Sequence, residues 1–143
     1  MATRARTAAR VRDYMTPSPR TIRPRQTLAE AHRVMRRNKI RHLPVLDRGK
    51  LVGIVSQRDL ALIESLPDVD PGEVPVEDAM VGDVYVVAPA TPLGDVAGEM
   101  ARRKLGAAVV ADGRRVVGVF TATDACRALS RLVSAVRAPR AAR

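Results

Sequence analysis

Apolar side chains between positions 27 and 38 recur at three- and four-residue intervals, the spacing of one face of an α-helix. The residues on that face are Leu28, Ala31, Val34 and Met35. We predict an amphipathic helix over Thr27–Asn38, with Thr27 as its N-cap and Glu30 in the capping-box position. A second helix is predicted over Pro92–Arg103, with Thr91 as N-cap and Pro92 at the first helical position.

Two short β-rich runs follow each predicted helix. The four runs are His42–Leu46, Lys50–Val55, Ala107–Ala111 and Arg115–Phe120. Within each pair, an Asp and a nearby Gly separate the two runs, which predicts two β-hairpins. Helices should then begin near Ser56 and Thr121, the last of them running to about Ala138. Short strands at Arg20–Arg23 and Tyr85–Ala88 are expected to open the two units.

The two halves of this pattern are copies of each other. A shift of 65 residues, without a gap, places identical residues on Val11, Asp13, Met15, Pro24, Leu28, Met35, Arg37, Lys39, Val45, Asp47, Val52, Gly53 and Asp59. Turn, core and acidic positions therefore repeat together, which indicates an internal duplication.

The duplication sets the expected architecture. We predict an α+β fold in which two βαββα-type repeats pack with pseudo-twofold symmetry into one module that shares one core, because a single repeat buries too little apolar surface. The expected divisions are a basic flexible tail (1–10), the first repeat (11–66), a Pro- and acid-containing linker (67–75), the second repeat (76–133), and the end of the last helix with a basic tail (134–143).

Charge and cysteine content narrow the picture. The net charge is +10, and six of these charges lie near the ends, on Arg4, Arg6, Arg10, Arg137, Arg140 and Arg143. No apolar run approaches the length of a membrane span, and the N-terminus lacks the apolar stretch of a secretory signal. The single cysteine, Cys126, cannot form an internal disulfide, so we expect a reducing, cytoplasmic setting.

One repeated segment carries recognisable chemistry. Ser56 and Thr121 stand where a strand ends and a helix begins, and Asp59 and Asp124 follow three residues later. The unpaired N–H groups of a helix N-terminus suit a phosphate, and a carboxylate suits ribose hydroxyls. The same residues are equally those of ordinary N-capping, so the segment alone leaves both interpretations open.

The repeats together resemble a pair of cystathionine-β-synthase-type (CBS) domains over residues 11–133. The motifs are Asp-Tyr-Met-Thr (13–16), Arg-His-Leu-Pro-Val (41–45) and Gly-Ile-Val-Ser-Gln-Arg-Asp (53–59), with Asp-Ala-Met (78–80) and Gly-Val-Phe-Thr-Ala-Thr-Asp (118–124) in the second copy. The resemblance implies a non-catalytic sensor that binds AMP, ADP, ATP, S-adenosylmethionine or an NAD-type ligand in clefts between the repeats. It also implies a homodimer formed through the helices.

The resemblance assigns candidate ligand residues. Ribose and phosphate contacts fall to Ser56, Arg58, Asp59, Thr121 and Asp124, further phosphate contacts to Arg41 and His42, and the adenine pocket to Thr21, Ile22, Val86 and Val87. The second copy has Gly106 and Ala107 in place of the basic pair, so we expect two unequal clefts.

The residues also bear on two other function classes, enzymes or metalloproteins and nucleic-acid-binding proteins. His32 and His42 lack partners at zinc-ligand spacing, and the chain has no nucleophile elbow or phosphate loop, so we expect no metal site, no catalytic residue and no catalytic cofactor. The alternative to a sensor is a nucleic-acid-binding protein that uses the Arg-rich tails and the helical cluster Arg33, Arg36, Arg37 and Lys39.

Overall fold

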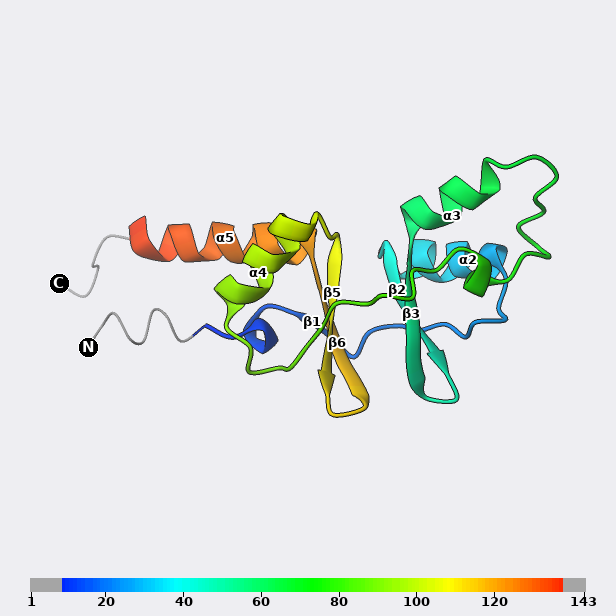
Figure 1. Cartoon of the computed structure of the whole chain (residues 1–143). Helices are drawn as coiled ribbons and strands as arrows, with labels where there is room; N and C mark the ends of the chain where they lie inside the picture. The colour runs from blue at the N-terminus through cyan, green and yellow to red at the C-terminus, as the bar shows by residue number, and fades with distance from the viewer. Residues whose placement is uncertain (1–8, 138–143) are drawn as a thin grey trace.

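A computed structural model describes residues 9–137 of the chain (Figure 1). The first half contains η1 (Val11–Asp13), β1 (Thr16–Pro17), α2 (Leu28–Asn38), β2 (His42–Asp47), β3 (Lys50–Ser56) and α3 (Gln57–Glu64). The second half contains η2 (Val76–Asp78), β4 (Val86–Val87), α4 (Leu93–Arg103), β5 (Ala107–Asp112), β6 (Arg115–Thr121) and α5 (Ala122–Arg137). The predicted α+β pattern of two like repeats is confirmed.

The helices of the two repeats begin differently. Thr27 caps α2, because its hydroxyl accepts the backbone N–H of Glu30 at 3.2 Å. The Glu30 side chain does not return the bond of a capping box; it accepts from Gln26 Nε2 at 3.1 Å. Pro92 is itself the N-cap residue of α4, with extended backbone and no side-chain cap. The predicted placement of Thr91 as cap and Pro92 as first helical residue was therefore one position too early.

Each repeat contains one antiparallel hairpin, as predicted. In the first, Arg48 and Gly49 both adopt positive φ angles, 52° and 82°, which gives the tight turn between β2 and β3. The opening strands are shorter than expected. β4 has two residues and runs parallel to β5, whereas the Arg20–Arg23 segment contributes only a single bridge, from Ile22 to Val45.

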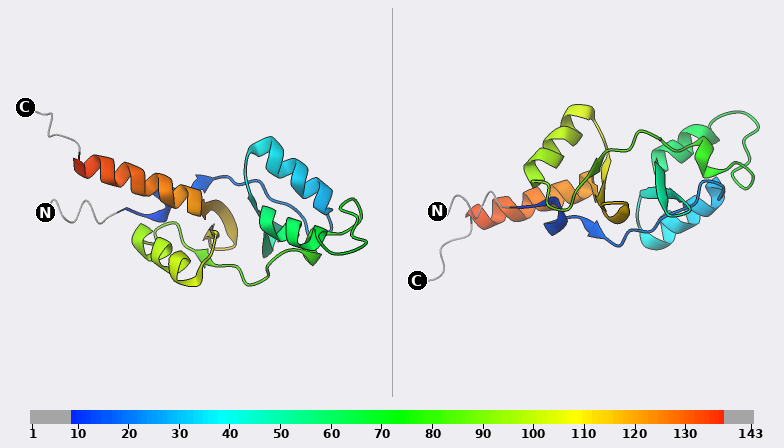
Figure 2. Two further views of the ribbon diagram at one scale, coloured as in Figure 1. Left: turned by 90° about the horizontal axis from the view of Figure 1, so that it is seen from above. Right: turned by 60° about the horizontal axis from the view of Figure 1, so that its bottom comes forward.

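The apolar residues gather in two clusters, whereas one shared core was expected. The first cluster centres on Leu28, Leu43 and Leu60, and the second on Val96 and Phe120. Each hairpin packs its own helix pair, as Figures 1 and 2 show for α2 and α3 at one end and α4 and α5 at the other.

The opening segments of the repeats are exchanged. Val11 belongs to the second cluster and donates its N–H to the carbonyl of Thr91 at 2.9 Å, while Val76 belongs to the first and donates to the carbonyl of Gln26 at 2.7 Å. β1 extends the second sheet, which has the order β1-β6-β5-β4. Figures 1 and 2 accordingly show η1 beside α4 and η2 beside α2.

Two glycines allow the exchanged segments to approach the hairpins closely. A Cβ on Gly53 would lie 2.6 Å from Met80 Sδ and 2.9 Å from the Val81 carbonyl, and Gly118 is covered by Met15 in the same way. Each methionine comes from the other repeat, so the two halves interlock. Each apolar cluster therefore includes an opening residue of the other repeat, Val76 in the first cluster and Val11 in the second.

Among residues 9–137, no helix combines the length and apolar character that a membrane crossing requires.

Candidate functional site

Both Ser/Thr-x-x-Asp segments form complete capping boxes. Ser56 is the last residue of β3; its hydroxyl accepts the N–H of Asp59 at 3.1 Å, and Asp59 Oδ2 accepts the N–H of Ser56 at 2.9 Å. Thr121 and Asp124 make the same two bonds at 3.2 and 3.0 Å. The helix-capping interpretation is thus correct for both segments. A ligand could be bound only by the carboxylate lone pairs that do not accept a capping hydrogen bond.

Asp124 has almost no capacity left. Its side chain is 4% exposed, and its oxygens also accept the hydroxyls of Thr16, at 3.2 and 3.3 Å, and Thr121, at 3.1 Å. Arg127 adds an ion pair at 3.0 Å. Because Thr16 belongs to the exchanged opening segment, this carboxylate joins the two repeats.

Asp59 is more available. Its side chain is half-buried, and among the described residues the only donor to its carboxylate is the Ser56 N–H, on Oδ2. The residue that corresponds to Thr16 is Val81, which is 46% exposed and offers no hydroxyl. Oδ1 of Asp59 is therefore open to a ligand hydroxyl, and Arg58 beside it is exposed.

His42 lies next to this carboxylate and against the other repeat. It pairs with Ser56 across the hairpin, and its Nε2 lies 3.1 Å from the position of a Cβ on Gly106. Burial lowers the pKa of His42 below its usual 6.5; Arg41 lowers it further, and Asp59 opposes both. The ring is therefore neutral at neutral pH, and a bound anion would favour its protonation.

The four residues predicted to contact adenine divide into two exposed and two buried side chains, because successive residues of an extended segment point to opposite faces. Thr21 and Val86 occupy equivalent positions and are exposed, whereas Ile22 and Val87 are buried in the two clusters. The backbone of Ile22 is also engaged, since its N–H donates to Pro44 and its carbonyl accepts from Leu46. Only Thr21 and Val86 can therefore offer side chains to a ring.

The structure brings Arg41, His42, Ser56, Arg58 and Asp59 together at one end of the first hairpin, beside Gly106 of the second repeat. Sequence reasoning missed Thr16 and Arg127, the additional partners of Asp124. No repeat signal marks them, because their counterparts are Val81 and Leu62. Over residues 9–137 there is no group of three or more His, Cys, Asp or Glu side chains placed to hold a metal ion.

Comparison with known proteins matches both repeats to one family. The CBS domain family model matches residues 11–64 and 76–131. The CBS domain-containing protein YhcV of Bacillus subtilis is 30% identical over 114 residues, which cover 80% of this chain and 81% of YhcV. Curated relatives named as enzymes match over a small part of their length, 22% in one case and 24% in another.

Two similar solved structures contain ligands. The CBS domain pair of protein MJ0100, in complex with 5′-methylthioadenosine and S-adenosyl-L-methionine, is 28% identical with a TM-score of 0.79, over 87% of this chain and 98% of that one. The protein CBSX2, in complex with AMP, is 27% identical with a TM-score of 0.74, over 85% and 97% of the two chains. With both repeats matched by the family model and the whole fold shared with such pairs, this chain belongs to the CBS domain family.

Proposed function

We propose that the chain is a regulatory module that binds an adenosine-containing ligand between its two repeats and catalyses no reaction. The observation that carries the proposal is the cluster of Asp59, His42 and Arg41 at the contact with Gly106 of the other repeat. Similar CBS pairs bound to AMP or to S-adenosylmethionine support the ligand class.

Each residue of the cluster has a chemical part in this proposal. Asp59 Oδ1 would accept a ribose hydroxyl, and Arg41 and Arg58 would pair with phosphate through charge-assisted hydrogen bonds. The half-buried His42 would become protonated as the phosphate approached. The aliphatic side chain of Val86 would cover one face of the adenine.

The second site would respond differently. A ribose hydroxyl can reach Asp124 only by displacing Thr16 or Arg127, because these groups already occupy its oxygens. Releasing Thr16 would loosen the exchanged segment of the first repeat from the second. Ligand binding at Asp124 would thereby shift the equilibrium between the packed and the released state of the repeats. The size of this shift is set by the difference in ligand affinity between the two states.

We further propose that two copies associate through their helices. Leu129, Val133 and Val136 stand at i, i+4 and i+7 of α5 and are between 45% and 71% exposed, and Leu62 on α3 is 67% exposed; an apolar helix face left open in this way is typical of an interface. Light scattering after size exclusion should give twice the 15.5 kDa mass of one chain. A monomer at micromolar concentration would contradict this part.

A reducing compartment such as the cytoplasm suits the exposed thiol of Cys126.

Thermal-shift measurements with AMP, ADP, ATP and S-adenosylmethionine test the ligand proposal. We expect at least one of them to raise the Tm, by a mass-action effect that grows with ligand concentration. The double variant Asp59→Ala/Asp124→Ala should lose that ligand-induced rise relative to its own ligand-free Tm. The control Asp112→Ala, an exposed acid at the end of β5, should keep it. No shift of the wild-type protein with any of the four ligands would contradict the proposal.

A further inference from the structure

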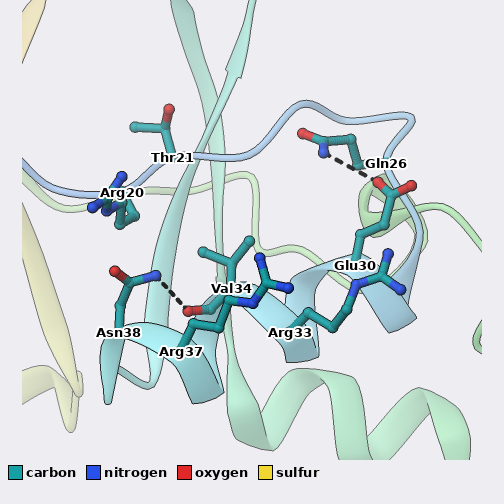
Figure 3. A pocket seen from close by; sticks show the side chains of 8 residues that line it. All are labelled: Arg20, Thr21, Gln26, Glu30, Arg33, Val34, Arg37 and Asn38. Atoms are coloured by element: carbon teal, nitrogen blue, oxygen red, sulfur yellow. Dashed lines mark hydrogen bonds between the residues drawn. The ribbon is translucent and has the colours of Figure 1, made fainter.

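A basic groove lies on the first repeat, between the extended 20–26 segment and α2 (Figure 3). Its volume is about 570 Å³. Arg20 and Thr21 come from the extended segment, and Arg33, Arg37 and Asn38 come from the facing side of α2. Thr21 is the only ligand candidate from the inter-repeat site that lines it.

The three guanidinium groups of the groove carry uncompensated charge. Arg20, Arg33 and Arg37 are all exposed, and none of them takes part in an ion pair within the described 9–137 region. The one carboxylate in the groove, Glu30, already accepts a hydrogen bond from Gln26. Arg33 and Arg37 also stand four residues apart on one helix, where like charges repel by a few tenths of a kcal/mol.

The second repeat shows that the fold does not require this concentration of charge. Arg20, Arg33, Val34 and Arg37 correspond to Tyr85, Gly98, Glu99 and Arg102. There, Glu99 lies 2.6 Å from Arg102 and 3.9 Å from Arg103, and Arg103 sits over the ring of Tyr85 at 5.3 Å. The equivalent surface is thus neutralised by its own side chains, while the groove of the first repeat leaves its cations open.

We propose that the groove binds a small anion with two or more phosphoryl groups, at a site separate from the inter-repeat contact. Guanidinium groups bind phosphate oxygens in pairs, and the Thr21 hydroxyl can donate one further bond. Val34 is the one apolar side chain in the lining, so no wall for a nucleobase exists.

The limited extent of the groove favours a small anion over a nucleic-acid strand. Beyond Gln26 and Glu30 it continues into a stretch lined also by Asp47 and Glu77, next to Arg23 and Arg25. These carboxylates would repel the phosphates of an extended strand. The charge that attracts phosphate is therefore confined to the end formed by Arg20, Arg33 and Arg37.

Isothermal titration of the full chain with sodium tripolyphosphate tests the proposal. We expect saturable binding, weakened about tenfold or more by Val34→Glu, which introduces the acid of the second repeat, and by Arg33→Gly, which introduces its glycine. Arg36→Ala removes the same charge from the same helix outside the groove, so it should leave binding nearly unchanged. Asp59→Asn/Asp124→Asn should also retain tripolyphosphate binding, whether or not AMP binds.

Three results would overturn the proposal. The first is the absence of saturable tripolyphosphate binding. The second is an equal loss of tripolyphosphate affinity in Arg36→Ala and Arg33→Gly. The third is a single-stranded oligonucleotide that binds the wild type and is weakened by Val34→Glu, while tripolyphosphate does not bind. The last result would assign the groove to a nucleic-acid strand. Circular dichroism of each variant separates a loss of binding from a loss of fold.

Discussion

The two equivalent carboxylates should differ sharply in what they contribute to stability. Replacing either aspartate by alanine breaks one of the two capping-box bonds, the one that the carboxylate accepts from the N–H of the N-cap residue, which costs about 1 kcal/mol. Asp59→Ala loses little else, because among the described residues the Ser56 N–H is the only donor to the Asp59 carboxylate. Asp124→Ala also removes the buried acceptor of Thr16, and a hydrogen bond to a charged group contributes about 1.5–3 kcal/mol. The Arg127 pair adds little, since Arg127 is 55% exposed.

We therefore expect the free energy of unfolding to fall by about 1 kcal/mol in Asp59→Ala and by about 3 kcal/mol in Asp124→Ala. Urea unfolding at neutral pH measures both, provided that the slopes of the transitions agree. Thr16→Val supplies the residue of the equivalent position 81, and it should destabilise the wild type but cost almost nothing further in Asp124→Ala. Equal losses in the two aspartate variants, or additive effects of Thr16→Val and Asp124→Ala, would refute this reasoning.

Two other features make predictions. Gly53→Ala should lower the free energy of unfolding in urea by about 1–3 kcal/mol, because the new methyl group meets Met80. Gly94→Ala is the control: the space around Gly94 is open, so this variant should be neutral or stabilising. An unchanged free energy of unfolding in Gly53→Ala would argue against the exchange of opening segments. The lowered pKa of His42 stabilises the fold fully above pH 6.5, and this contribution is lost as pH falls through the folded-state pKa. His42→Gln should therefore flatten the dependence of unfolding free energy on pH below about 6.5, and identical profiles would contradict it.

Local pattern was sufficient for the helices and hairpins but not for the exchange of segments. The turn at Arg48 and Gly49 can be predicted from these adjacent residues alone. By contrast, Val11 and Val76 are identical, and both repeats offer the same partners to them. Whether each packs on its own repeat or on the other is decided by chain geometry over long distances, which no periodicity records.

The candidate site was predicted in part for a similar reason. Ser56 and Asp59 could be found because their spacing repeats 65 residues later. The partners that distinguish the two sites could not, because Thr16 has no counterpart hydroxyl and reaches Asp124 only through the exchanged segment. Likewise the arginines of α2 were visible as a cluster, but only the position of Arg20 shows which of them line the groove.

We propose that an adenosine-containing ligand binds between the repeats, first at the open carboxylate of Asp59. Calorimetric titration of AMP into the wild type, Asp59→Asn and Asp124→Asn tests it most directly. We predict saturable binding that Asp59→Asn weakens about tenfold or more, and that Asp124→Asn weakens less. Binding of AMP with the same affinity in all three proteins would contradict the claim.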